Sequence, residues 1–463
     1  MKLSKCCENA ICRDLYYNFL RFYYLERRSV EENRPSWTSR YTFILATIGS
    51  AVGLGNIWRF PYIMGQHGGA VFLITYLLIM LTICFIPLIT ELSIGKILKK
   101  ECVSAYESIN PKLKFLGYLN PITGLLISSF YFIVGGWILY YIYLSAVNLK
   151  ITDHAVHFST FTQSPIITCI LTLVFLFICM FFTARGVKKG IEFANNYMMP
   201  LFAIILICLI IFSLSLPNAH LGLEYMFKPD FSKINGQMFL AALGQALFSL
   251  SIGMGTLLIY GSYIKEDKSI TKSAYTIIFF DTMFALMSGI MIFPAIFSFG
   301  LEPNSGAGLV FVTLPQIFSQ ISHGNLIFMA FFVFLLVAAL TSGISILEVP
   351  VATLIERFKI SRVKASAILF GIISIVAIPA TLSFGLLKHL TIFQKTIFDF
   401  LDFITANVLM PINALALCLI AAWGLKFKSE MFIKNKVLST LFDVGLKFVI
   451  PTIMIVLLYI GLK

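Results

Sequence analysis

The sequence predicts an all-α membrane protein with eleven transmembrane helices, and three observations lead to this fold class. Of the 463 residues, 59% are hydrophobic and only 12% are charged, whereas an average soluble domain has about 25% charged residues. Apolar segments long enough to cross a bilayer recur along the whole chain. The net charge of +13 is concentrated in particular connections between these segments. Together these features exclude a water-soluble enzyme.

The apolar segments follow one another with short polar connections. They cover residues 41–64, 70–95, 119–149, 164–184, 193–216, 237–263, 273–299, 325–355, 365–387, 396–424 and 441–462. A helix of about 20 residues crosses the hydrocarbon core of a bilayer, and each segment reaches that length. Residues 1–33 form an arm rich in aromatic and basic residues, which we expect in the cytoplasm; one interpretation is an interfacial helix. Residues 34–463 then form a single domain.

The basic residues orient the chain in the membrane. If successive segments alternate in direction, 27 of the 35 Lys and Arg residues lie on the same side as the N-terminus and seven on the other. Cytoplasmic connections carry the excess of Lys and Arg in membrane proteins. We therefore expect a multi-pass protein of the cell membrane, with a cytoplasmic N-terminus and an extracellular C-terminus. The positive charge then needs no nucleic-acid partner.

Two segments contain an interruption that is unfavourable in a helix. Thr47–Asn56 holds three glycines, and Ser249–Gly255 in the sixth segment holds two. Isolated glycines also serve as packing residues in membrane helices, which is the alternative explanation. The two breaks are five segments apart, and because five is odd, repeats of five segments would be inverted in the membrane. The repeats would be 34–216 and 237–427, with 441–462 as helix 11; paired broken helices of this kind are typical of secondary transporters.

Known catalytic motifs are missing from the sequence. There is no zinc-binding HExxH motif, no P-loop and no GxSxG nucleophile motif, so we do not expect an enzyme. Cys6, Cys7 and Cys12 cluster in the N-terminal arm, but no histidine joins them to complete a metal site.

The residues around the first break resemble a known motif. Ser50–Pro61, which reads SAVGLGNIWRFP, closely resembles the first-helix motif of the neurotransmitter:sodium symporter family. Further segments fit the same family in order and spacing, from Trp37 to Lys463: Gly68–Phe72, Glu91–Gly95, Arg185–Glu192, Ser249–Gly255 and Leu340–Ser342. The resemblance implies the LeuT fold, of the prokaryotic eleven-span type, and sodium-coupled uptake of amino acids.

The resemblance also implies two bound sodium ions. The first would be held by the substrate carboxylate and by four residues, Ala51, Asn56, Ser249 and Asp281. The second would be held by carbonyl and hydroxyl oxygens of Gly49, Val52, Ala338, Thr341 and Ser342. Hard oxygen ligands of this type suit a hard cation. For the Thr and Ser hydroxyls the alternative is a hydrogen bond to their own helix, which is common in membranes.

Asp281 lies in the middle of an apolar segment, where a lone charge is costly and needs a partner. Many members of the family have Asn at this position and use chloride to supply the negative charge. A fixed carboxylate replaces it here, so we expect transport that does not require chloride.

The substrate would bind between the two breaks. Its ammonium group would meet backbone carbonyls at half-helix C-terminal ends, and its carboxylate would meet two backbone amides and a tyrosine hydroxyl. The residues implied for the whole substrate site are Ala51, Leu54, Gly55, Ile127, Tyr131, Phe248, Ser249, Ser251, Met254, Ser342, Gly343 and Ile346. No side chain among them is ionised, and Gly343 with Met254 suggests a roomy pocket. A neutral aliphatic or aromatic amino acid is therefore expected, with several substrates accepted.

Two gates and a hinge complete the family pattern. The outer gate would consist of Arg59, Asp402, Gln245, Tyr131 and Phe248, with Asp399 as a rival to Asp402. The inner gate would consist of Arg34, Trp37, Tyr263 and Glu356. For either ion pair the alternative is an ordinary surface pair worth about 0–1 kcal/mol.

Sodium release would depend on the fifth segment. Local unwinding between Gly190 and Pro200 would let water reach the second ion; the alternative is an ordinary helix start near Phe193. We expect Gly190→Ala to slow release and to spare outward-facing binding. Two further intramembrane acids, Glu91 and Glu348, are expected to bind backbone groups of the broken helices.

The predicted function is secondary active symport of a neutral L-amino acid with two sodium ions. The partners are the amino acid, sodium and membrane lipid. Two alternatives are a carrier of another amine or osmolyte on the same fold, and a membrane receptor that binds an amino acid without moving it.

Overall fold

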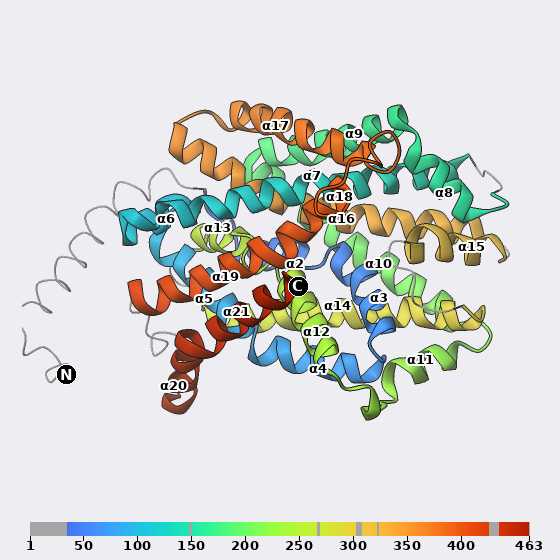
Figure 1. Ribbon diagram of the computed structural model, residues 1–463, viewed down its shortest axis with the longest axis horizontal. Helices are drawn as coiled ribbons and strands as arrows, with labels where there is room; N and C mark the ends of the chain where they lie inside the picture. The colour runs from blue at the N-terminus through green and yellow to red at the C-terminus, as the bar shows by residue number, and fades with distance from the viewer. Residues whose placement is uncertain are drawn as a thin grey trace, which may run out of the picture.

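The computed structural model describes residues 35–147, 151–265, 269–301, 308–321, 324–425 and 435–462. Across these ranges all regular elements are helices, and the long ones lie side by side in one bundle (Figure 1). The predicted arm at residues 1–33, with its three cysteines, lies outside the described residues, as does Arg34 of the predicted inner gate.

The first half of the chain forms twelve helical elements. They are α2 (Arg40–Ala51), η1 (Gly55–Arg59), α3 (Phe60–Gln66), α4 (Ala70–Thr82), α5 (Phe85–Leu98), α6 (Cys102–Ile109), η2 (Pro111–Leu113), α7 (Lys114–Ala146), α8 (His154–Gln163), α9 (Pro165–Ala184), η3 (Val187–Glu192) and α10 (Phe193–Leu214).

The second half continues the bundle. Its elements are α11 (Ala219–Phe227), η4 (Phe231–Lys233), α12 (Gly236–Ser249), α13 (Thr256–Ser262), α14 (Ile270–Ser298), η5 (Leu309–Thr313), α15 (Leu314–Ser319), α16 (Gly324–Phe358), α17 (Arg362–Leu382), α18 (Ile397–Phe403), η6 (Ile404–Leu409), α19 (Met410–Leu419), η7 (Ile420–Gly424), α20 (Lys436–Val444), η9 (Gly445–Val449) and α21 (Ile450–Gly461).

Nine helices in the described part of the chain are long and apolar enough to cross a membrane. A tenth results if Arg40–Ala51 and Gly55–Gln66, which meet at a bend of 50°, count as one span. The predicted sixth segment corresponds to α12 and α13, whose 14 and 7 residues are each too short to cross alone. The count of eleven therefore requires α12 and α13 to act together as one span, and it stays a prediction.

The first break follows from the local sequence. Ser39 caps the start of α2 by accepting a hydrogen bond from the Thr42 amide, in a capping box. The helix ends at Ala51, and Val52 has an extended backbone with ψ of 90°. A Cβ built on Gly53 would lie 2.3 Å from the Ser342 hydroxyl oxygen, so only glycine lets α16 approach the chain this closely.

The second break, between α12 and α13, depends on left-handed backbone. Ser251, Gly253 and Gly255 have φ of 56°, 79° and 81°. A Cβ on Gly253 would lie 2.4 Å from the Met410 carbonyl oxygen, so the chain must have glycine there to pack against α19. Both breaks are buried, which satisfies the rule that irregular backbone at membrane depth must be enclosed by protein or line a cavity.

The core of the bundle lies around α7 and α16, which pack along one another. Their most apolar stretches are 78% and 72% buried, whereas the corresponding stretch of the span that contains α10 is only 28% buried. In a membrane protein the exposed apolar side chains of such a peripheral helix face lipid. The two broken helices contact this core, with α2 packed against α16 and α13 against both α5 and α16.

Candidate functional site

A buried carboxylate cluster joins the two breaks. Asp281 on α14 is fully buried. The Ser249 hydroxyl, at the end of α12, donates to its two carboxylate oxygens at 2.8 and 2.9 Å. The Asn56 side-chain amide, at the first break, donates to Oδ1 at 2.9 Å and to the backbone carbonyl of Asp281 at 3.2 Å. The structure therefore brings together the three side chains predicted for the first sodium site.

A fourth member of this cluster was not predicted from the sequence. Tyr76 on α4 is buried, and its hydroxyl donates to Asp281 Oδ2 at 3.2 Å. The sequence carried one signal, since a mid-membrane acid needs a partner. It did not indicate which of the many tyrosines and serines in neighbouring segments would supply that partner.

All of these hydrogen-bond donors are uncharged. Among the described residues, Asp281 forms no ion pair with a Lys or Arg side chain. A buried carboxylate that is not neutralised carries a large desolvation cost, which a cation bound beside it offsets. The cluster therefore has the composition of a cation site, with one fixed negative charge and neutral oxygen atoms around it.

The residues predicted for the second sodium ion lie where α2 meets α16. The Ser342 hydroxyl donates to the Gly49 carbonyl at 3.3 Å and to the Ser50 carbonyl at 3.4 Å. The Thr341 hydroxyl contacts the carbonyls of Val337 and Ala338 on its own helix, both at 3.1 Å, as in the alternative interpretation. Each hydroxyl oxygen keeps lone pairs that remain able to face a cation.

Beside these hydroxyls lies Tyr131 of α7. Its hydroxyl is buried and has no hydrogen-bond partner in the described part of the chain. A Cβ built on Gly53 would lie 3.5 Å from this hydroxyl and 2.3 Å from the Ser342 hydroxyl. An orphan donor next to the first break is available to an acceptor from outside the protein, because a buried polar group without a partner is costly.

The other predicted substrate residues surround the two breaks. Ala51 and Leu54 flank the first break, and a Cβ built on Gly55 would lie 3.2 Å from the Phe248 ring. At the second break, the Ser251 hydroxyl donates to the Ser50 carbonyl at 3.4 Å. The apolar members Ile127, Met254 and Ile346 are buried.

One prediction about pocket size needs correction. The space beside Gly343 is filled by protein, since a Cβ there would lie 2.9 Å from Cys179 Sγ and 3.0 Å from the Phe132 ring. Glycine at this position therefore permits α7 and α9 to pack against α16. It does not supply the room for a large substrate side chain that we expected.

The second break is held by polar groups from two other helices. The Gly253 amide donates to Glu91 Oε2 on α5 at 3.3 Å, which agrees with the role expected for Glu91. The Asn413 side-chain amide on α19 donates to the Gly253 carbonyl at 2.8 Å and to the Thr123 hydroxyl at 3.0 Å. Asn413 was missed, although a polar residue inside an apolar segment is a detectable signal.

The outer gate residues are close together. Arg59 donates to Gln245 Oε1 at 3.1 Å, and its guanidinium lies 4.9 Å from the centre of the Phe248 ring. Gln245 in turn donates to the Gly55 carbonyl at 2.9 Å. These contacts connect the first break to α12, the helix that also contributes Ser249 to the cluster around Asp281.

Of the two acids proposed for this gate, Asp402 is the one near Arg59. Its carboxylate is close enough for its charge to act on the guanidinium, although the two described side chains form no ion pair. Asp399 instead accepts a hydrogen bond from Thr396 at 2.7 Å, at the exposed start of α18. The structure thus favours Asp402 over its rival.

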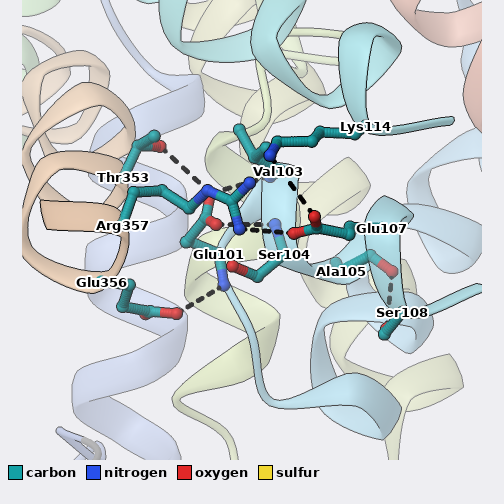
Figure 2. A network of polar contacts seen from close by, with 10 residues as sticks. All are labelled: Glu101, Val103, Ser104, Ala105, Glu107, Ser108, Lys114, Thr353, Glu356 and Arg357. Atoms are coloured by element: carbon teal, nitrogen blue, oxygen red, sulfur yellow. Dashed lines mark hydrogen bonds and ion pairs between the residues drawn. The ribbon is translucent and has the colours of Figure 1, made fainter. Parts of the chain in front are cut away.

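Of the four residues predicted for the inner gate, the structure describes Trp37, Tyr263 and Glu356. Trp37 is fully buried; its indole nitrogen donates to the Tyr260 carbonyl at 3.0 Å and its amide to the Tyr263 carbonyl at 3.2 Å. Glu356 lies near the end of α16, and its Oε2 accepts a hydrogen bond from the Glu101 amide at 3.1 Å (Figure 2).

Figure 2 shows the polar network around this acid. The Glu101 carboxylate caps α6 by accepting hydrogen bonds from the Val103 and Ser104 amides. Glu107 on α6 is paired with Arg357 and, at 3.4 Å, with Lys114. The hydrogen bond from Arg357 lowers the pKa of the Glu107 carboxyl below its usual range, so the Glu107 carboxylate stays ionised at neutral pH.

Glu348 requires a second correction. In the part of the chain that the structure describes, it accepts no hydrogen bond from the backbone of a broken helix. Its carboxylate forms a two-pronged pair with Arg362 at 2.7 and 2.9 Å and accepts the Tyr263 hydroxyl at 2.7 Å. Arg362 also donates to the Thr183 carbonyl at 3.1 Å. The physical reason is that a fully buried carboxylate is most stable beside a guanidinium, and the turn after α16 brings one back to it.

The predicted hinge lies in a continuous helical segment. Residues Val187–Glu192 form a π-helical turn, and α10 continues through Pro200 without interruption. Glu192 accepts hydrogen bonds at 2.7 Å from both the Thr38 amide and the Thr38 hydroxyl, and at 3.0 Å from the Thr42 hydroxyl. Unwinding between Gly190 and Pro200 thus remains a prediction about another conformation.

Comparison with known sequences identifies relatives along nearly the whole chain. Residues 34–160 and 146–463 match the family model of the sodium:neurotransmitter symporter family. A sodium-dependent transporter of Bacillus subtilis is 37% identical over 397 residues, covering 84% of this chain and 88% of that protein. A sodium-dependent transporter of Haemophilus influenzae is 35% identical over 446 residues, covering 92% and 98%.

Comparison with solved structures agrees with this family assignment. The crystal structure of MhsT in complex with L-phenylalanine matches with a TM-score of 0.85 at 39% sequence identity, covering 93% of this chain and 100% of that one. MhsT has the LeuT fold, and the helical bundle of the present chain shares its overall arrangement.

Proposed function

Because the chain belongs to the sodium:neurotransmitter symporter family, we propose that it imports a neutral, hydrophobic L-amino acid together with two sodium ions, without chloride. It would work by alternating access in the cell membrane, with the N-terminus inside and the C-terminus outside. The LeuT architecture proposed for it has eleven spans, two inverted five-helix repeats, and first and sixth helices that are unwound at the midplane.

A single observation carries the proposal: the buried Asp281 carboxylate is surrounded by neutral donors that belong to both broken helices. Asn56 and Ser249 come from the first and second break, respectively. A sodium ion at this cluster supplies the missing positive charge and joins the two breaks. The carboxylate of a bound amino acid completes the ion's ligands, so substrate and sodium each stabilise the other's binding.

Recognition of the amino-acid backbone uses opposite ends of the half-helices. Amides of Leu54 and Gly55 stand at the start of a helical segment, where partial positive charge favours a carboxylate. The unpartnered Tyr131 hydroxyl adds a third donor. Carbonyls of Ala51, Phe248, Ser249 and Ser251 lie at helix ends of opposite polarity, which suits an ammonium group.

The side-chain class follows from the apolar surroundings of the breaks. Ile127, Met254 and Ile346 are buried and uncharged. The Phe248 ring is partly buried, and the Arg59 guanidinium lies over it. A charged substrate side chain would be left without a partner there. The L-phenylalanine bound to MhsT supports a hydrophobic amino acid for this chain.

Alternating access requires a barrier on each side of the site. The proposed outer barrier is Arg59 with Gln245, Phe248 and Asp402, and the proposed inner barrier is Trp37, Tyr263, Glu356 and Arg34. Arg59 lies within reach of Gln245 and of the charge of Asp402, but it is not locked to a carboxylate, so the outer contacts are weak enough to break in each cycle.

The test is sodium-dependent binding of each of the twenty amino acids to the purified protein, with potassium replacing sodium as the control. We expect binding of one or more large aliphatic or aromatic amino acids in sodium only. A screen without any sodium-dependent binding would refute the proposal. Binding of a different amine or osmolyte would favour the alternative carrier, and binding without uptake into proteoliposomes would favour a receptor.

A further inference from the structure

Asn195 on α10 is a buried side chain whose oxygen is unused. Its exposed fraction is 1%, and its amide nitrogen donates to the Ile191 carbonyl at 2.9 Å. The side-chain oxygen Oδ1 has no hydrogen-bond partner in the described part of the chain. Exchanging oxygen and nitrogen would place two acceptors against each other at Ile191, so the hydrogen bond fixes which atom points away from it.

The unused oxygen lies against Gly49, one of the residues of the second proposed sodium site. A Cβ built on Gly49 would lie 2.0 Å from Asn195 Oδ1 and 3.2 Å from Asn195 Cγ, so the amide lies directly against α2 at this residue. The Gly49 carbonyl is itself a proposed ligand and accepts the Ser342 hydroxyl at 3.3 Å. An unpartnered acceptor in a buried position is costly, and a cation next to it removes that cost.

The position of Asn195 on its own helix is equally informative. It lies midway between Gly190 and Pro200, the ends of the proposed hinge. Any unwinding of this segment moves Asn195 Oδ1 relative to Gly49, because Asn195 belongs to α10 whereas Gly49 belongs to α2. A ligand in this position would be removed by the same movement that opens the path for the ion.

We propose that the side-chain carbonyl of Asn195 is a further ligand of the second sodium ion, supplied by the helix whose rearrangement releases it. The proposal rests on the function proposed above and deepens it. A neutral amide oxygen is a hard ligand that suits sodium and adds no charge. Loss of this ligand when α10 rearranges weakens sodium binding on the cytoplasmic side and couples the movement to release.

The experiment compares two substitutions at Asn195 with the same two at its neighbour. Asn195→Leu removes the oxygen at similar volume, and Asn195→Asp replaces it by a carboxylate. Asn196 is exposed, so Asn196→Leu and Asn196→Asp are matched controls on the same turn of α10. The readout is the sodium concentration that gives half-maximal amino-acid binding, together with amino-acid affinity at saturating sodium.

Asn195→Leu should raise the half-saturating sodium concentration about tenfold, because the sodium ion loses the side-chain oxygen of Asn195 as a ligand. Asn195→Asp should lower it about tenfold, because a unit charge is added close to the ion. Amino-acid affinity at saturating sodium should be unchanged in both, and the Asn196 variants should behave like wild type. If Asn195→Leu does not fold, the comparison of Asn195→Asp with Asn196→Asp is sufficient to test the proposal.

Two results would overturn the inference while leaving the proposed function intact. One is an unchanged sodium dependence in both Asn195 variants. The other is an equal loss in both variants that also lowers amino-acid affinity at saturating sodium, which would indicate a packing role. Absence of sodium-dependent binding in the wild-type protein would overturn the proposed function itself, and this inference with it.

Discussion

Asp281 is held by hydrogen bonds from three side chains on other segments of the chain, and none of these side chains carries a positive charge. Ser249, Asn56 and Tyr76 orient the carboxylate oxygens and leave the negative charge intact. At a separation of 4 Å and an effective dielectric constant of about 20, a unit charge attracts a cation by about 4 kcal/mol. The carboxylate therefore strengthens the binding of a cation at the proposed first sodium site.

The first prediction concerns chloride and this residue. Replacing chloride by gluconate should leave sodium-driven uptake by the wild-type protein unchanged, because Asp281 supplies the negative charge. Asp281→Asn should weaken sodium binding at least about tenfold, since loss of 1.4 kcal/mol already has that effect. Sodium titrations of amino-acid binding in both anions measure the two effects.

Asp230→Asn is the matched control for this charge removal, because Asp230 is exposed between α11 and η4 and belongs to none of the proposed sites. It should behave like wild type. Uptake that disappears in gluconate would show that Asp281 does not replace chloride.

At the scale of helices, the proposed hinge is closely packed. A Cβ on Gly190 would lie 1.9 Å from the Phe182 carbonyl oxygen, so the π-helical turn rests directly on the end of α9. No side chain fits between them without moving one of the two segments. The sequence alone suggested that Gly190→Ala would spare binding, but this contact indicates that it also disturbs the conformation described here.

We therefore expect Gly190→Ala to destabilise this conformation by about 1–3 kcal/mol, the usual effect of overpacking. Turnover in proteoliposomes should fall with it. Gly371→Ala on α17 is the control, since a Cβ there meets open space and should leave stability unchanged or slightly raised. Thermal unfolding of the two purified variants gives the comparison; equal midpoints would contradict a close contact at Gly190.

At the scale of the whole molecule, Glu348 connects four helices. Its carboxylate on α16 binds Arg362 of α17 and Tyr263 at the end of α13, and Arg362 also binds the Thr183 carbonyl on α9. A buried pair of this kind contributes little compared with well-packed apolar residues, but breaking it leaves an uncompensated charge. The contribution of the Glu348–Arg362 pair to stability is therefore best measured by comparing variants that lose one of the two charges with a variant that loses both.

Glu348→Gln or Arg362→Gln alone should destabilise the protein by about 3–5 kcal/mol. The double variant Glu348→Leu with Arg362→Met should recover most of that loss, because neither charge remains buried. Unfolding of the detergent-solubilised protein measures all three. Single variants as stable as wild type would mean that solvent or lipid headgroups compensate the remaining charge.

The sequence predicted much of this architecture, for physical reasons. Spanning helices are indicated by local apolar composition, and the breaks by glycines that are poor helix formers, so both can be detected within one segment. The contact between Tyr76 and Asp281 cannot be detected in this way, because the two residues lie in distant segments of the chain. Tyr76 lies 205 residues from Asp281, and nothing in its own segment indicates that contact.

The corrections have the same origin. Gly343 was interpreted from its own size, but Cys179 and Phe132 on two other helices fill the space next to it. Glu348 was assigned to a broken helix, while the guanidinium that neutralises it lies after the next turn of the chain. In both cases the role of the residue depends on side chains from another helix that pack against it. A single sequence does not show where that helix lies.

The bonds of Glu192 make a mechanical linkage between the first and fifth helices. Glu192 belongs to the π-helical turn, and its carboxylate accepts hydrogen bonds from the Thr38 amide, the Thr38 hydroxyl and the Thr42 hydroxyl at the start of α2. Hydrogen bonds to a charged group contribute about 1.5–3 kcal/mol each. The turn at Val187–Glu192 therefore cannot rearrange on its own. Either the first turn of α2 moves with it, or the hydrogen bonds of Glu192 to Thr38 and Thr42 must break first.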